Sequence, residues 1–276
     1  MPDITMAISC TNGEQFSLIL PEPAKLNSFY AFSMHKAGSS LMEKMLIDIC
    51  SKLSIPAVNP HASAWLNGIS TGVISPDLAR ALKPVGYAYL GFRHVFPLGM
   101  DVDLDTPKKI LLVRDPRDML TSLYFSHRHS HPTPRQQGSE KKDMADRRRN
   151  AEEQHINDFA IKYAAHYENL FTGYRDHLLS LPNTKVFRYE NIIFDKENWL
   201  LSMLDFFGVL DSYPEKTVLK HARKIARKHD LRPRKENPGK HVRQVTPGNY
   251  KKHLSPDTIK SLDNSLAPFL DYFHYS

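Results

Sequence analysis

An apolar run that leads straight into a short polar turn constrains the fold of this chain most. Phe29 to Met34 is apolar enough to be a buried strand, and the turn His35 to Ser40 follows at once. Apolar residues then recur at helical spacing from Leu41 to Ile49. The pattern predicts a strand, a turn and a helix. Ser40 with Glu43 three residues later predicts a capping box at the start of that helix.

Strand patterns and helical patterns alternate along the rest of the chain. Strands are predicted at Tyr87 to Arg93, Ile110 to Val113 and Lys185 to Arg188, and helices from about Arg117, from about Ala151 to Leu179, from Asn198 to Phe207 and from Ile259 to Phe273. This alternation predicts a single α/β domain over residues 1–276, with a mostly parallel central sheet flanked by helices. Such sheets bind ligands at the carboxyl ends of their strands.

Charge and cysteine content limit the partners and the compartment. The net charge of +7 favours anionic partners, among them a multiply phosphorylated nucleotide, nucleic acid or an anionic membrane, although surface lysines alone could explain it. Cys10 and Cys50 are too few for a disulfide framework, which indicates a reducing compartment. No apolar stretch approaches the roughly 18 residues of a membrane span. A cytoplasmic protein without a membrane anchor is expected.

The first polar turn has the residues of an anion site. A strand-to-helix turn presents free backbone N–H groups and the positive end of the helix dipole. Lys36 adds a full charge, Gly38 allows close approach of the backbone, and Ser39 and Ser40 add hydroxyl donors. The lysine precedes the glycine, unlike the order in a Walker A loop, which argues against an ordinary ATPase or GTPase. By itself, Lys36 could be a solvated charge at a strand end.

A second motif follows the strand Ile110 to Val113. Arg114 can bind a phosphate with its forked guanidinium, and Ser122, about two helical turns later, can donate to the same group. Asp115 and Pro116 have a simpler explanation, because both residue types are common at the start of a helix. Arg114 and Ser122 are not explained by that alternative.

These motifs resemble those of the family of sulfotransferases that use 3'-phosphoadenosine 5'-phosphosulfate (PAPS). The turn from His35 through Lys36, Ala37, Gly38 and Ser39 to Ser40 is similar to the family's 5'-phosphosulfate loop, and Arg114 to Ser122 to its 3'-phosphate motif. The segment Phe187 to Asn191 resembles the one whose tyrosine, here Tyr189, approaches the adenine. His241 to Lys251 is similar to the late loop that grips the 3'-phosphate, with only Arg243 and Gly248 retained with confidence.

The resemblance implies transfer of a sulfuryl group from PAPS, leaving adenosine 3',5'-bisphosphate (PAP), to a hydroxyl or amine of a small-molecule or saccharide acceptor. It implies no metal. The Thr-Val pair of the family's common dimer motif is missing after Lys251, so the oligomeric state stays open. A P-loop kinase would need a Walker A order and a Mg²⁺ carboxylate. A nucleic-acid-binding module would need aromatic residues among its basic runs.

The resemblance also assigns the chemistry. His94 follows the strand Tyr87 to Arg93, as the family's catalytic histidine follows a strand, and imidazole titrates near neutrality. Lys36 is expected to stabilise charge on the leaving phosphate oxygen. His35 is the alternative base. Phe92 stands where many members have a second lysine, and Arg93 is expected on the opposite face of the strand.

Two polar segments, 128–150 and 232–252, are predicted to be mobile loops over the site. The first contains His129 and His131, which with His127 could suggest a metal, but no carboxylate follows at ligand spacing and a solvated loop is favoured. The run Arg147 to Arg149 is predicted to be a solvated face.

Overall fold

A parallel sheet forms the centre of the molecule. The structure is a computed structural model that describes residues 3–96, 100–130, 134, 136–233, 236–237 and 243–275. Within these residues the sheet has the order β4-β5-β3-β6-β7, with every pair parallel. Its strands are β3 (Phe29–Ser33), β4 (Ala57–Val58), β5 (Ala88–Phe92), β6 (Lys109–Val113) and β7 (Thr184–Arg188). The predicted α/β fold is confirmed.

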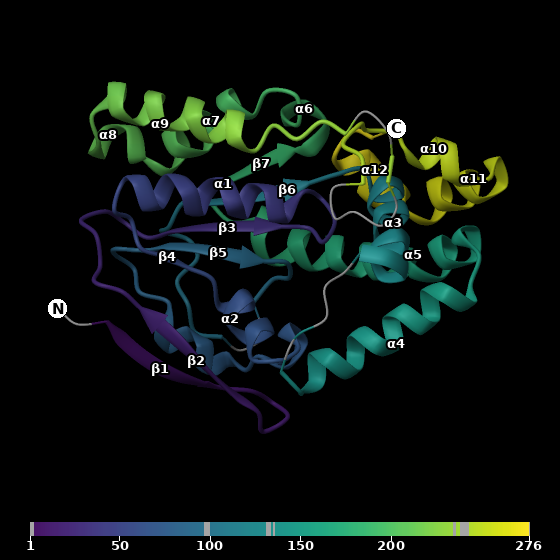
Figure 1. The fold of residues 1–276 in the computed structure, drawn as a ribbon, viewed down its shortest axis with the longest axis horizontal. Helices are drawn as coiled ribbons and strands as arrows, with labels where there is room; N and C mark the ends of the chain where they lie inside the picture. The colour runs from purple at the N-terminus through teal and green to yellow at the C-terminus, as the bar shows by residue number, and fades with distance from the viewer. Residues whose placement is uncertain are drawn as a thin grey trace.

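Helices cover both faces of this sheet (Figure 1). The strands β3, β5 and β6 are buried along their whole length, which explains why they are apolar runs in the sequence. One face is covered by α1 (Ser39–Lys52), α7 (Lys196–Phe207) and α9 (Glu215–Lys228), and the other by α2 (Pro60–Leu66) and α5 (Ile156–Tyr174). On the first face Phe29 stacks on Phe207 of α7 at 4.0 Å between ring centroids.

The remaining elements surround the sheet and the helices that cover it. The hairpin of β1 (Ile4–Ser9) and β2 (Gln15–Leu20) lies beyond α2, and α3 (Pro116–Phe125) lies near the carboxyl ends of the strands (Figure 1). The other short elements are the 3₁₀ helices Thr71–Val73 and Pro76–Ala81, the π-helical turns Ser126–Ser130 and Arg175–Leu179, α6 (Tyr189–Ile192), α8 (Val209–Ser212), α10 (Tyr250–His253), α11 (Pro256–Ser265) and α12 (Ala267–Tyr272).

A bulge changes the direction of side chains at the end of β5. Tyr30 pairs with Tyr89, but Phe32 pairs with Phe92, so β5 has one residue more than β3 over this stretch. Gly91 accommodates the bulge with a φ of 85°. The residues after the bulge therefore do not follow the simple alternation of a strand.

Much of the described part of the first polar segment is helical where a loop was predicted. α4 spans Ser139–Glu153. The helix predicted from Ala151 to Leu179 therefore begins later, at Ile156 of α5, and its last residues form the π-helical turn Arg175–Leu179. The start of α4 is anchored far away in the sequence: the carboxylate of Glu14 accepts from the Ser139 hydroxyl at 2.6 Å and from its backbone N–H at 3.2 Å. Residues 131–133 and 135 of this segment, His131 included, lie outside the described residues.

Other predictions changed in detail. The C-terminal amphipathic stretch forms two helices, α11 and α12, and the segment 232–252 ends in α10. Residues 234–235 and 238–242 of that segment lie outside the described residues. Both cysteines are buried free thiols. No helix among the described residues is long and apolar enough to span a membrane.

Candidate active site

Four neighbouring strands of the sheet end around one cavity. Its volume is about 720 Å³. At the carboxyl ends, β3 is followed by Lys36, β5 by Arg93 and His94, β6 by Arg114, and β7 by Tyr189, and all five residues line the cavity. The parallel sheet thus collects at one edge residues that lie far apart in the sequence.

The turn after β3 is a cradle of backbone and small side chains. Lys36 has a φ of 69°, a conformation that a residue with a side chain adopts at a cost, and Gly38 has a φ of 97°. A Cβ on Gly38 would lie 2.9 Å from the ring of Tyr189, so glycine is needed for space as well. Ser39 and Ser40 open α1 and line the cavity, whereas Ala37 is fully buried beside it.

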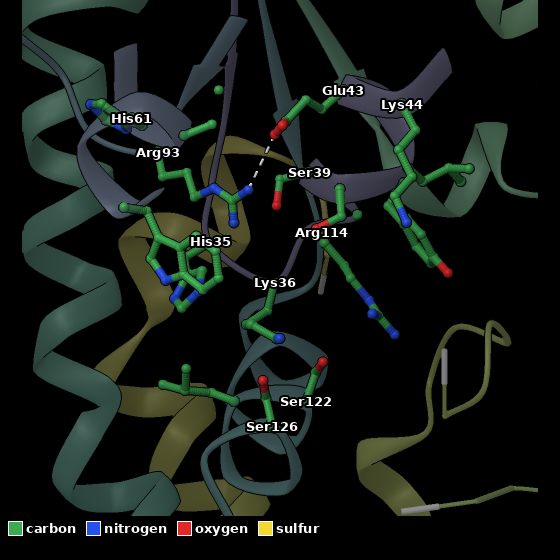
Figure 2. Close-up of a pocket in the computed structure, with 18 of the residues that line it drawn as sticks. His35, Lys36, Ser39, Glu43, Lys44, His61, Arg93, Arg114, Ser122 and Ser126 are labelled. Atoms are coloured by element: carbon green, nitrogen blue, oxygen red, sulfur yellow. Dashed lines mark hydrogen bonds and ion pairs between the residues drawn. The ribbon is translucent and has the colours of Figure 1, made fainter. Parts of the chain in front are cut away.

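The capping box predicted at this turn is wrong. Gly38 occupies the N-cap position of α1, and no side chain caps the helix. Glu43 instead pairs with Arg93 across the cavity, with 3.3 Å between the carboxylate and the guanidinium (Figure 2). Gly38 has no side chain to accept from the first N–H groups of α1, and its carbonyl accepts only from those of Leu41 and Met42, at 3.0 and 3.1 Å. The N–H groups of Ser39 and Ser40 lie at a helix start, where no intrahelical carbonyl is available. They are suited to an anion.

Positive charge is concentrated at this turn. Burial lowers the pKa of Lys36 to about 7, and Arg93, Arg114 and Arg243 lower it further by repulsion. The pKa of Arg243 falls to about 10, through burial and the neighbouring Arg114. These positive charges repel one another, and a bound anion would relieve the repulsion. In Figure 2 the Lys36 side chain extends toward Ser122 and Ser126 of the facing segment.

Arg114 follows β6 as the second motif predicts. Its guanidinium lies over the Tyr189 ring at 4.4 Å and donates to Asp118 at 3.1 Å. The buried Nε of Arg114 has no hydrogen-bond partner among the described residues, which leaves a donor for a ligand. Ser122 lies on the next turns of α3 and lines the same cavity. Asp115 caps α3 by accepting from the Arg117 N–H at 2.9 Å.

The late loop borders the cavity, but only some of its residues line it. Gln244 and Val245 line the cavity, and the Tyr189 hydroxyl donates to the Val245 carbonyl at 2.9 Å. Arg243 is buried, lies over the Phe125 ring at 4.3 Å and forms an ion pair with Glu236. Arg243 and Gly248 are not among the described cavity-lining residues. His241 and Val242, the start of this motif, lie outside the described residues.

Most of the chain matches one known family of proteins. The model of the sulfotransferase domain family matches residues 32–271. The chain belongs to the sulfotransferase family. No curated protein matches its sequence. Among solved structures, mouse sulfotransferase SULT7A1 complexed with PAP is similar with a TM-score of 0.54 and 14% identity, over 90% of this chain and 86% of that one.

A second similar structure is retinol dehydratase in a complex with retinol and PAP. Its TM-score is 0.50 with 15% identity, over 96% of this chain and 90% of that one. At these identities the likeness shows the fold. The family predicted from the motifs is confirmed, and the chain is a sulfotransferase. The roles given to single residues stay predictions.

His94, the predicted base, follows the end of β5. It lines the cavity, and burial lowers its pKa to about 4, helped by His166, Arg93 and Arg147. It is therefore neutral at neutral pH. His35, the alternative base, also lines the cavity. The expectation that Arg93 faces away from the site is wrong, because the strand ends at Phe92 and Arg93 lines the cavity.

The helix α4 brings residues to the cavity that the sequence did not suggest. Arg147, predicted to be a solvated residue, lines the cavity and pairs with the buried Glu140 at 3.1 Å. Burial raises the pKa of Glu140. His127 is buried in the π-helical turn after α3 and not in a solvated loop. In the sequence, the one feature that could have indicated these cavity residues is the spacing of Glu140 and Arg147, which lie two turns apart on one helix.

Further cavity residues come from α2 and α5. His61 and Trp65 lie one turn apart on α2, and His166 belongs to α5. Burial lowers the pKa of His61 to about 3 and also lowers that of His166. Their patterns in the sequence resemble ordinary helix faces. No group of three or more histidine, cysteine, aspartate or glutamate side chains suited to a metal occurs in the part of the chain that the structure describes.

Proposed function

We propose that this sulfotransferase moves a sulfuryl group from PAPS to a hydroxyl or amine of a small-molecule or saccharide acceptor by in-line displacement. The single observation that carries the proposal is that Lys36, Arg114 and His94 line one cavity. Two anion-binding segments in one cavity fit a nucleotide with phosphate at both ends. The unpartnered Nε of Arg114 and the space kept open at Gly38 support the same donor.

The residues divide between the two ends of the donor. Lys36, Ser39, Ser40 and the backbone at Ala37 and Gly38 hold the 5'-phosphosulfate. The 3'-phosphate is held by Arg114 and Ser122, with Arg243 and Gly248 of the late loop closing around it. Tyr189 packs against the adenine. PAP, with both phosphates, is the product that remains.

The transfer itself needs a base and a cation on opposite sides of the sulfur. The acceptor oxygen or nitrogen attacks sulfur while the bond from sulfur to the leaving phosphate oxygen breaks. His94 takes the acceptor proton, and Lys36 stabilises the charge that develops on the leaving oxygen. Retinol and androsterone occupy related structures, which supports small-molecule acceptors. A cytoplasmic location is part of this proposal.

Ligand-induced stabilisation tests the donor. PAP should raise the melting temperature of the protein, and 5'-AMP should raise it much less, because it lacks the 3'-phosphate. Arg114→Ala should remove most of the difference. Equal shifts with both nucleotides in the wild-type protein would rule out the donor assignment. Incubation with PAPS and acceptor pools, followed by mass spectrometry for products heavier by one sulfuryl group, then identifies the acceptor.

A further inference from the structure

One buried carboxylate connects the two segments that the proposed function assigns to the 3'-phosphate. Asp118 lies in the first turn of α3, and its side chain has no exposed surface. One of its oxygens, Oδ2, accepts from the Arg114 guanidinium at 3.1 Å and from the Gly248 N–H at 2.8 Å. The other, Oδ1, accepts from the Tyr250 N–H at 2.9 Å.

These bonds join parts of the chain that are otherwise remote. Gly248 and Tyr250 are 130 and 132 residues away from Asp118. Gly248 has a φ of 78°, and this backbone conformation belongs to the turn that presents its N–H to the carboxylate. A buried carboxylate needs several donors, and here the donors come from Arg114 on one side and from the late loop on the other.

We propose that Asp118 is a positioning residue that makes this sulfotransferase selective for 3'-phosphorylated nucleotides. It holds Arg114 and the late loop that carries Arg243 in one fixed arrangement, so that both cations meet the same phosphate. This inference rests on the proposed function, since it takes the 3'-phosphate as the group that Arg114 binds.

Electrostatics alone predicts the opposite effect of removing this charge. A carboxylate that contacts the Arg114 guanidinium repels an incoming phosphate, so its neutralisation should strengthen anion binding if geometry is unimportant. If Asp118 acts by positioning, the same change should weaken binding. The sign of the effect therefore separates the two explanations.

The test compares PAP and 5'-AMP binding by calorimetry in the full-length protein. Asp118→Asn keeps the size of the side chain but replaces one acceptor oxygen by an NH₂ group, which cannot accept from the loop or from Arg114. We expect PAP to bind about 10- to 100-fold more weakly, as for the loss of a hydrogen bond to a charged group, with 5'-AMP binding almost unchanged. The KM for PAPS should rise while kcat stays close to wild type.

Asp263→Asn is the matched control. Asp263 of α11 pairs with Arg117 of α3 at 2.6 Å and is half-exposed, so the variant removes a nearby charge but none of the hydrogen bonds that Asp118 accepts. It should keep the wild-type preference for PAP. A folded Asp118→Asn protein that binds PAP as tightly as wild type, or more tightly, would overturn the inference.

A second variant tests the loop side of the link without changing charge. The position of a Cβ on Gly248 has no neighbour within 4 Å, so Gly248→Ala strains the left-handed turn without a steric clash. It should weaken PAP binding selectively, even if Asp118→Asn fails to fold, and unchanged selectivity would contradict the inference. A wild-type protein that does not prefer PAP over 5'-AMP would instead refute the proposed function, and the inference with it.

Discussion

The depressed pKa of Lys36 makes donor binding depend on pH in a calculable way. Its pKa of about 7 in the free protein results from burial and from repulsion by three arginines. A bound phosphate should return the pKa toward the ordinary lysine value of 10.5 by favouring the charged form. Between these two values the complex holds one more proton than the free protein. PAP binding must therefore weaken as pH rises.

The size of the effect follows from the pKa. With a free pKa of about 7, the affinity for PAP should fall about 50-fold between pH 7 and pH 9, approaching a factor of ten for each pH unit. At pH 8 the protein should take up about 0.9 proton for each PAP bound. Phosphate groups, whose second pKa is about 6, are almost fully ionised above pH 7 and contribute little over this range.

Calorimetry in two buffers with different ionisation heats measures both quantities. Lys36→Arg is the matched control, because arginine stays charged over this pH range. An arginine at this position would also have the same backbone strain as Lys36, whose φ is 69°. Its PAP affinity should be nearly independent of pH. A wild-type affinity that stays flat from pH 7 to 9, with no proton uptake at pH 8, would refute the reasoning about Lys36.

Three further results are expected. His94→Ala should lower kcat by about two to four orders of magnitude with little change in PAP affinity, and loss of turnover only in His35→Ala would move the role of base to His35. Gly38→Ala should weaken PAP binding, measured by calorimetry, because its Cβ would lie 2.9 Å from the Tyr189 ring in a left-handed turn; unchanged binding would contradict this cradle. Amide exchange in Ser139–Glu153 should slow when PAP and acceptor bind, because Glu140 and Arg147 of this helix line the cavity, and unchanged protection would contradict the prediction that this segment is a mobile part of the site.

The sheet and its phosphate loop could be predicted because local patterns determine them. Five consecutive buried residues in β3, followed at once by a turn and a helical stripe, have few alternatives. The candidate anion-binding residues then followed from the rule that parallel strands bind ligands at their carboxyl ends. Lys36, Arg114 and Tyr189 lie together for that reason.

Long-range contacts account for the parts that could not be predicted. α4 has only three buried residues, so its sequence shows almost no apolar stripe, and its start depends on Glu14 of the distant hairpin. Arg93 lies after the bulge at Gly91 and beyond the end of β5, so the alternation of a strand does not predict its direction. The missing capping box has the same origin, because Glu43 is engaged by Arg93 from another strand.

The contact between Glu14 and Ser139 has a consequence for how the shape of the cavity can change. Glu14, at the turn of the N-terminal hairpin, is not among the residues that line the cavity, yet it holds the start of the helix that carries Glu140 and Arg147 into it. Substitutions in the hairpin are therefore expected to change the shape of this side of the cavity without altering any residue that lines it. A chimaera that exchanges α4 alone between relatives would separate the helix from its anchor, so hairpin and helix have to be exchanged as a pair.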